Sequence, residues 1–575
     1  MNIKKYQILN RVVVAALCAL LSPLSSLLFS SCSDILETES ELVEYEKDNT
    51  LNHPTDSVYS VMGIINKMQY IADRVVLLGE VRSDLVSVTD AASSDLKRLA
   101  AFDFSQSNKY NQVSAYYAVI NNCNYFLNHV DTTLQRRGKN VFANEYAAVK
   151  AFRAWTYLEL VKAYGEVPLV TTPMMTEREA AAAVAGPRSD IKAVCDYFIS
   201  DLTPVAYVDI PAYRGLAEDE FFLPIRALLG DLCLWAGRYD EAAHWYSDYL
   251  SDKKAPIKMN QSNRSVWTSP TSFTSPSRRY SLSSNEQLSY IPMETRVFDG
   301  VISDLPNIFN STTDNNYYFQ LQPSTALRRL SASQNYCMEY QSTTAIDTIY
   351  VPHEGLGDNI YAGDLRFCSV FSQRTSGSQD PYSEYSSTTQ TIDKIRNGQV
   401  TSYRSPMIYL RFAEALNRAG YPQSAMLILK HGLCNENAQK YDSLEFNGGA
   451  RQYIFFDETL FRREDVVGIH SRGCGDAQCD TLYDVPVPPM ALATRQDTIA
   501  YQIPLVEDMI INEMALEGCF EGYRFYDLMR VALRRDDPAY LADPVSRRNG
   551  EADPALRTLL MTQRNWYLPL PETGN

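Results

Sequence analysis

The sequence predicts a mainly α protein: a scaffold of helical hairpins interrupted by large, loop-rich insertions that carry a few short strands. Three observations predict this class. Apolar residues recur at helical spacing over several long segments. Two of these segments turn at a glycine and repeat one spacing of small and bulky residues. Between them, residues 253–400 lose helical periodicity and become rich in Ser, Thr, Asn, Gln and aromatic residues.

The first segment, residues 1–31, has the features of an export signal. Lys4, Lys5 and Arg11 precede the apolar run VVVAALCALL, which is too short and too soon broken by Pro23 to span a membrane. Small residues then lead to Cys32, in a pattern that resembles a bacterial lipobox. We therefore expect cleavage before Cys32 and a lipid on its sulfur, which would anchor the chain firmly. The alternative is an ordinary signal peptide followed by an unrelated cysteine.

Residues 32–50 predict a flexible tether, because acidic residues crowd this stretch and apolar ones are few. The acids are Asp34, Glu37, Glu39, Glu41, Glu44 and Glu46. Removing the three bases of the leader leaves 50 bases against 69 acids, a net charge of −19 for the mature chain. Such an acidic chain lacks the clustered cations that a general nucleic-acid binder needs.

Residues 51–252 predict the N-terminal part of the helical scaffold. In 113–129, Tyr116, Ile120, Asn124 and Leu127 fall on one face of a helix. A second helix is expected from about 144 to 164, with Gly165 ending it and a proline shortly beyond.

Two later segments predict helical hairpins that turn at Gly237 and Gly420. In the first, Gly230 is followed twelve residues on by Ala242 and four further by Tyr246. The second repeats these intervals with Ala413, Ala425 and Leu429. Small residues at these offsets let two helices approach closely, a pattern similar to the tetratricopeptide repeat.

The remaining chain divides into an insertion and a C-terminal helical region. Residues 253–400 are expected to be loop-rich and to hold the ligand, because binding residues commonly lie on loops carried by a rigid scaffold. Residues 401–575 continue the helical scaffold, with a second loop-rich insertion over 434–500.

Motifs for catalysis are absent from the sequence. It has six histidines and no HExxH, G-x-S-x-G or glycine-rich phosphate loop, so we expect a binding protein without a cofactor. Cys474 and Cys479 suggest a local disulfide and have no histidine that would complete a zinc set. Asp476 and Asp480 are only a weak signal for a calcium site.

Six segments in order resemble the SusD/RagB nutrient-binding lipoproteins of Bacteroidetes. They are LLGEVRSDLV at 77–86, YYAVINNCNYFL at 116–127, KAFRAWTYLELVKAYGEVPLV at 150–170, YLRFAEALNRAG at 409–420, EMALEGCFEGYRFYDLMR at 513–530 and NWYLPLPETGN at 565–575. Within them, Arg153, Glu521, Arg524 and Asp527 are expected to support the scaffold. Arg524 in particular is expected to reach back one turn to Glu521 or to pair with Asp527, which would join a helix end to a neighbouring helix.

The resemblance implies a function at the outside of the outer membrane. Family members close as a lid over a SusC-like, TonB-dependent barrel and hand it an oligosaccharide or, in the RagB branch, a peptide. The tether at 32–50 would let such a lid swing. Three alternatives remain beside a glycan-binding protein: a peptide-binding protein of the same fold, a lipoprotein hydrolase with two converging acids, and a structural repeat adaptor without an aromatic pocket.

The resemblance also places the ligand site on the loop after the first motif and on the large insertion. Aromatic rings cover the C–H face of a sugar, and amides and carboxylates bind its hydroxyls. The candidate residues are Asp84, Asn108, Tyr110, Asn111, Trp267, Tyr280, Tyr290, Tyr317 and Tyr318. Each aromatic residue alone could equally be a packing residue. Arg278 and Arg279, beside Tyr280, would suit an acidic glycan or form a solvated loop.

Overall fold

The structure of the protein is a computed structural model with one large compact body, His53–Asn575. It describes residue 51 and residues 54–211, 219–252, 286–295, 300–310, 319–341, 346–351, 363–364, 366, 371–377, 386–395, 398–475, 477–478 and 480–570. The predicted signal, Cys32 and the acidic tether lie outside these residues. Among the helices that the structure describes, none combines the length and the apolar character that crossing a membrane requires.

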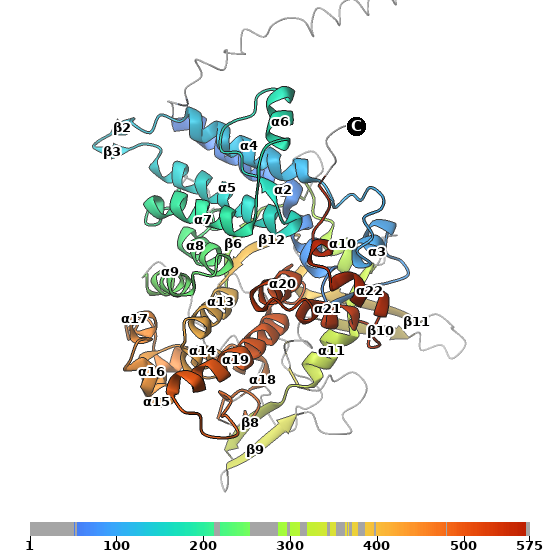
Figure 1. The fold of residues 1–575 in the computed structure, drawn as a ribbon, viewed down its shortest axis with the longest axis vertical. Helices are drawn as coiled ribbons and strands as arrows, with labels where there is room; N and C mark the ends of the chain where they lie inside the picture. The colour runs from blue at the N-terminus through green and yellow to red at the C-terminus, as the bar shows by residue number, and fades with distance from the viewer. Residues whose placement is uncertain are drawn as a thin grey trace, which may run out of the picture. The chain divides into compact units, whose positions relative to one another are not determined.

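The N-terminal half of the body is a layer of antiparallel helices (Figure 1). Its main helices are α2 (Pro54–Glu80), α4 (Val113–His129), α5 (Ala143–Tyr164) and α7 (Ile191–Leu202). The predicted helices at 113–129 and 144–164 are confirmed, the second beginning one residue earlier. Gly165 ends α5 at φ +81°, and a Cβ there would lie 2.9 Å from the Tyr567 ring, so glycine is needed both for the turn and for this contact.

Both predicted hairpins are present. The first is α8 (Ile225–Trp235) with α9 (Tyr239–Ser251), and the second is α13 (Ser405–Arg418) with α14 (Pro422–Lys430). A Cβ on Gly230 would lie 2.5 Å from Cε1 of Tyr246, which confirms that the small residue lets the two helices approach closely. Helix α9 packs against α13, so the hairpins stack although 153 residues separate Ser251 from Ser405 in the chain.

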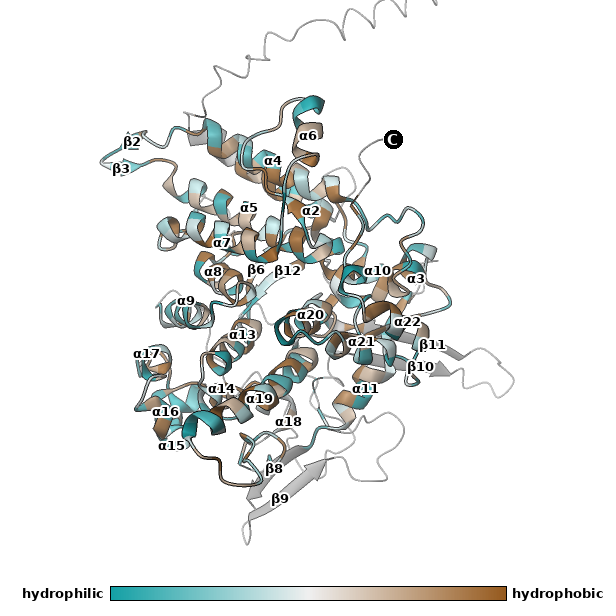
Figure 2. Cartoon of the chain, viewed as in Figure 1, coloured by the Kyte–Doolittle hydropathy of each residue, from teal (hydrophilic) through white to brown (hydrophobic). Residues whose placement is uncertain are grey.

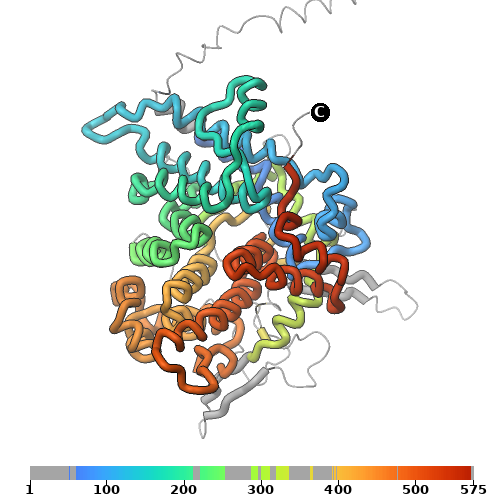
Figure 3. The backbone as a smooth tube through the Cα atoms, viewed as in Figure 1, coloured from blue at the N-terminus to red at the C-terminus, as the bar shows by residue number. Residues whose placement is uncertain are grey.

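The C-terminal helices return to the N-terminal part of the chain. They are α19 (Arg495–Gly518), α20 (Arg524–Arg535), α21 (Ala539–Ser546) and α22 (Pro554–Leu560). Arg548 donates to the carbonyl oxygens of Val81 and Ala100, and Arg82 donates to that of Trp566. Figure 3 shows the resulting contact, with the red C-terminal segment beside the blue N-terminal one.

Strands occur as antiparallel pairs in the described residues, and half of them lie within the first insertion, where short strands were predicted. The pairs are β1 (Val86–Val88) with β7 (Leu321–Pro323), β6 (Gln287–Ile291) with β12 (Val400–Arg404), β8 (Tyr336–Gln341) with β9 (Ile346–Val351), β10 (Phe371–Gly377) with β11 (Ser386–Ile392), β2 (Gln135–Arg136) with β3 (Lys139–Asn140), and β4 (Val167–Pro168) with β5 (Arg188–Ser189).

Short helices connect these elements. They are α3 (Ser94–Ala100), α6 (Glu177–Val184), α10 (Leu305–Phe309), α11 (Thr325–Ala332), and, in the second insertion, α15 (Asn435–Tyr441), α16 (Ser443–Phe446), α17 (Arg451–Ile454) and α18 (Ser471–Cys474). Apolar and polar residues mix along the longer helices (Figure 2), as expected where a helix buries one face and exposes the other.

Candidate ligand-binding surface

Four of the nine candidate residues lie outside the described residues: Trp267, Tyr280, Tyr317 and Tyr318. Arg278 and Arg279 lie outside them as well. The hypothesis about these six side chains therefore stays a prediction. The other five candidates, Asp84, Asn108, Tyr110, Asn111 and Tyr290, have defined surroundings.

Asp84 is committed to the scaffold. Its side chain is buried, and its two oxygens accept from Nε and Nη2 of Arg524 at 2.7 and 2.9 Å. A bidentate carboxylate–guanidinium pair of this kind joins two distant segments. Arg524 was expected to pair with Glu521 or Asp527, and that expectation is wrong. Glu521 instead binds Lys394 and Arg404.

In the loop at 103–111, which follows the first motif, the asparagine side chains bond to the protein itself. Asn108 is buried, donating to the Asp95 carbonyl and accepting from the Tyr110 backbone N–H. Asn111 is half-buried, donating to the Pro569 carbonyl and accepting from the Tyr164 hydroxyl. These bonds fix the loop conformation and use most of the polar groups that were proposed for a ligand.

Tyr110 and Arg74 keep buried polar atoms without a hydrogen-bond partner among the described residues. These atoms are the Tyr110 hydroxyl and the Nε and Nη1 of Arg74. Arg74 uses Nη2 to donate to Gln112 at 2.8 Å, just beyond the loop. Burial, with the nearby charges of Asp304, Asp95 and Asp73, raises the pKa of Tyr110. Its hydroxyl therefore remains protonated.

Helix α2 brings the insertion onto this loop. Gln69 donates to the Pro292 carbonyl at 2.7 Å and accepts from the Val301 N–H at 3.2 Å. One turn later, Asp73 accepts from the Ser303 hydroxyl and the Asp304 N–H, both at 2.6 Å. Burial raises the pKa of Asp73 to about 6, with these two bonds opposing the rise.

The β1–β7 pair adds a second connection. Thr89 donates from its hydroxyl to the Phe319 carbonyl at 2.5 Å and from its N–H to the Gln320 carbonyl at 2.9 Å. The backbone directly after Tyr317 and Tyr318 is thus held beside the first motif. The two chain segments that were expected to share a site are adjacent.

We give the name α2 surface to the exposed Lys67, Tyr70, Lys109, Ile302 and Asp304 of these segments, together with the half-buried Asp73 and Tyr290 and the buried Tyr110 beneath them. Tyr70 is 55% exposed and Ile302 is 41% exposed, although both are apolar. Tyr290 lies half-buried in β6, packed edge-on against Phe221 at 5.2 Å between ring centroids. Sequence analysis missed Tyr70; a tyrosine among exposed positions of an otherwise amphipathic helix was the available signal.

A cavity between α5, α8, α13, α20 and β12 is too small for a sugar. Its volume is about 30 Å³, room for one or two water molecules. Its charged lining residues form ion pairs with one another, such as Glu159 with Lys162 at 2.6 Å and Asp231 with Arg411 at 2.8 Å. We assign this cavity to the scaffold.

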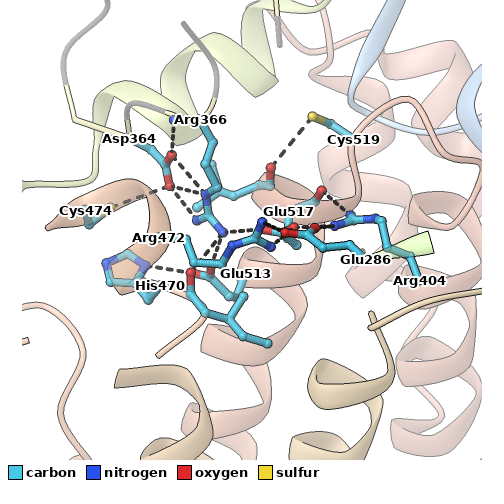
Figure 4. Close-up of polar contacts among 12 residues, drawn as sticks. Glu286, Asp364, Arg366, Arg404, His470, Arg472, Cys474, Glu513, Glu517 and Cys519 are labelled. Atoms are coloured by element: carbon cyan, nitrogen blue, oxygen red, sulfur yellow. Dashed lines mark hydrogen bonds and ion pairs between the residues drawn. The ribbon is translucent and has the colours of Figure 1, made fainter. Parts of the chain in front are cut away.

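The signature acids of EMALEGCFEGYR lie in a buried ionic cluster (Figure 4). Glu517 accepts from Arg366, Arg404 and Arg472, which come from the first insertion, β12 and α18. These three cations hold the pKa of Glu517 well below its usual range, against the effect of burial. Arg153 is likewise structural, since it bonds Asn124 of α4 and Asp201 near the end of α7. The predicted supporting role of the motif residues is confirmed.

The same cluster corrects the interpretation of Cys474. This residue was said to lack a histidine, but His470 is one helical turn away, and ligand atoms of Asp364, His470 and Cys474 lie within 4.8 Å of one another. Cys474 is buried with its sulfur 3.5 Å from Oδ2 of Asp364. Cys479 and Asp476 lie outside the described residues, so the suggested disulfide and calcium pattern stay predictions.

No protein-family model and no curated protein sequence matches the chain. Solved structures do match. A SusD superfamily protein from Bacteroides vulgatus ATCC 8482 aligns with a TM-score of 0.55 at 14% identity, over 90% of this chain and 96% of that one. A SusD-like carbohydrate-binding protein from Bacteroides fragilis NCTC 9343 aligns with a TM-score of 0.53 at 13% identity, over 85% and 88%.

A third structure, a SusD-like carbohydrate-binding protein from Bacteroides vulgatus ATCC 8482, aligns with a TM-score of 0.51 at 15% identity, over 84% of both chains. These alignments span nearly the whole length of each protein, so they concern the complete arrangement of helices and insertions. The chain therefore has the SusD fold, and the resemblance inferred from its motifs is confirmed at the level of the fold.

Proposed function

We propose that the protein binds a glycan on the α2 surface and delivers it to a SusC-like, TonB-dependent transporter. The observation that carries the proposal is the fold, which is shared along nearly the full chain with structures described as SusD-like carbohydrate-binding proteins. Contacts of α2 and of Thr89 with residues 292, 301, 303, 304 and 319, close to the loop at 103–111, support its location.

The chemistry of the α2 surface suits a sugar. Tyr70 offers an exposed ring, and Lys67 lies 5.7 Å from its centroid. Asp304 is an exposed acceptor and Lys109 an exposed donor, so hydroxyl-binding groups of both kinds are present. An aromatic face with flanking polar groups is the usual composition of a carbohydrate site.

The first test uses soluble protein that begins at Ser33, with affinity gels and calorimetry against plant and host polysaccharides and a mixture of peptides. We expect binding to a glycan that weakens roughly tenfold in Tyr70→Ala, the usual effect of removing a central aromatic contact. Tyr207→Ala is the matched control, because Tyr207 is 66% exposed and lies on the loop after α7, away from α2. Equal binding by Tyr70→Ala and the parent protein would move the site off the α2 surface.

The panel also separates the alternative functions. Binding of peptides without glycans would indicate a RagB-like peptide-binding protein. Shortened products after incubation with a bound polysaccharide would indicate a hydrolase, and we expect none, because we propose binding without catalysis. Binding of neither class would leave the repeat adaptor.

We further propose that Cys32 carries the lipid and that the protein faces the cell exterior on the outer membrane. Metabolic labelling with palmitate should be lost in Cys32→Ala. Protease added to intact cells should digest the parent protein. Co-purification with a large outer-membrane barrel protein would support the transporter partnership, and recovery of the lipoprotein alone under mild solubilisation would count against it.

A further inference from the structure

The part of the buried ionic cluster nearest α18 carries an excess of negative charge. Among the described residues, the cluster contains six buried carboxylates and four permanent cations. The carboxylates are Glu286, Asp364, Asp480, Glu513, Glu517 and Glu521, and the cations are Arg366, Lys394, Arg404 and Arg472. The carboxylates therefore outnumber the permanent cations by two, in an environment where unpaired charge is costly.

Two buried atoms at this end of the cluster face each other. The Nε2 of His470 and the Oδ2 of Asp480 have no hydrogen-bond partner among the described residues, although both side chains are at least 95% buried. They lie 3.5 Å apart. Oδ1 of Asp480 accepts from the Leu482 and Tyr483 N–H groups, so that carboxylate is fixed with its other oxygen toward the histidine.

The histidine is held as a metal ligand usually is. Its Nδ1 lies 2.7 Å from Oε2 of Glu513, and its ring stacks on Tyr483 at 3.5 Å between centroids. A neutral histidine that donates Nδ1–H to a carboxylate presents an unprotonated Nε2, the arrangement found behind many metal-bound imidazoles. Figure 4 shows His470, Cys474 and Asp364 grouped at this end of the cluster.

Two of the ligand separations match those around a tetrahedral ion, and the ligand atoms of Asp364, His470 and Cys474 all lie within 4.8 Å of one another. Ligands about 2.0–2.3 Å from a tetrahedral ion lie about 3.3–3.8 Å from one another. The His470–Asp480 distance of 3.5 Å and the Cys474–Asp364 distance of 3.5 Å both fall in this range. His470 and Cys474 stand at the two ends of one helical turn, since the Cys474 N–H donates to the His470 carbonyl at 3.0 Å.

We propose that His470, Cys474, Asp480 and Asp364 bind a structural Zn²⁺ ion that ties the two insertions to α19. Nitrogen, sulfur and carboxylate ligands in a closed, buried set favour zinc over calcium or magnesium, which prefer oxygen. The ion takes a lone pair from the Cys474 thiolate, and the thiol proton passes to solvent; no electron transfer is involved. Once the Cys474 thiolate is counted, a divalent ion lowers the excess of negative charge in the cluster from two to one.

The test is the zinc content and stability of the mature protein from Ser33. The protein is unfolded with a strong chelator, refolded with or without Zn²⁺, and passed through gel filtration before elemental analysis. We expect one zinc ion per chain after refolding with Zn²⁺, with a higher thermal midpoint than the zinc-free sample. Refolding with Co²⁺ should give a thiolate-to-cobalt absorption band in the near ultraviolet.

The variants report on each ligand. Cys474→Ser should lose the cobalt–thiolate band, and His470→Ala should lose zinc. Cys233→Ser is the matched control, because Cys233 is equally buried, on α8, and should retain the metal and the band. A wild-type protein that refolds with native circular dichroism yet holds no zinc would overturn the proposal, and so would zinc retained in both ligand variants. Since zinc content does not depend on glycan binding, failure here leaves the proposed function standing.

Discussion

Replacing Asp84 by asparagine separates a scaffold residue from a ligand-binding residue. The sequence placed Asp84 among the candidates for glycan binding, whereas the structure buries its carboxylate against Arg524, with each side chain at most 7% exposed. Asparagine keeps the shape of the side chain and removes its charge. The change therefore leaves the Arg524 guanidinium buried without a counter-charge.

The expected loss of stability follows from that geometry. Removing one partner of a buried, bidentate ion pair costs about 3–5 kcal/mol. Arg548, whose pKa burial lowers to about 10, lies close enough for the Asp84 charge to favour its protonated form. Because Asp84→Asn deprives two buried cations of this carboxylate, we expect a loss in the upper half of that range.

Urea-induced unfolding followed by tryptophan fluorescence measures the change. Asp103→Asn is the control, because Asp103 is exposed and bonds only to Ser105, and it should alter stability by less than about 0.5 kcal/mol. In the double variant Asp84→Asn, Arg524→Gln, the loss of unfolding free energy should be about 2 kcal/mol smaller than the sum of the losses in the two single variants. A loss below about 1 kcal/mol, or reduced glycan affinity at unchanged stability, would refute the assignment of Asp84 to the scaffold.

Three further changes test the buried groups of the fold. Burial raises the pKa of Glu80 to about 8, above its unfolded value, so its contribution to stability falls as pH rises from about 4.5 to 8. The free energy of unfolding of Glu80→Gln, relative to that of the parent, should therefore rise by up to about 1.4 kcal/mol per pH unit across this range. A difference that does not change with pH would contradict this. Burial and the neighbouring Glu445 carboxylate raise the pKa of Asp442 to about 7, so the charged form destabilises the fold at higher pH. Asp442→Asn should therefore raise the thermal midpoint at pH 8, and the rise should be smallest at pH 4. Gly230→Ala should lower the free energy of unfolding by about 1–3 kcal/mol, because the added methyl group would clash with the Tyr246 ring. Gly63→Ala is the control and should not destabilise the protein, because a Cβ there meets nothing within 4 Å. Similar effects at both sites would contradict the close packing of α8 against α9.

Local patterns were enough to predict the helical scaffold. The helix at 113–129 was predicted at both ends, because its period of apolar residues is uninterrupted. The Gly230–Ala242–Tyr246 spacing predicted the first hairpin, because a small residue and a ring that must share one gap restrict how two helices pack. These signals act within one or two helical turns, or across a short hairpin.

The partners of charged residues were not predictable in the same way. Arg524 had acids three residues away on either side, yet it pairs with Asp84, 440 residues distant. Likewise His470 and Cys474 meet Asp364 only because the first insertion folds back onto α18. In a buried environment the choice of partner depends on which segments pack together, and sequence spacing carries little information about that.

The sequence by itself determined the helical class, the hairpin spacing, the family resemblance and the expectation of an anchored, acidic, exported chain. The tertiary structure alone decided which polar residues are consumed by the scaffold, and it removed Asp84 and Asn108 from the set of free ligand-binding groups while adding Tyr70. The physical reason is that helix formation and hairpin packing are local, so the sequence records them directly. Exposure and charge pairing depend on contacts between distant segments, and these exist only in the folded chain.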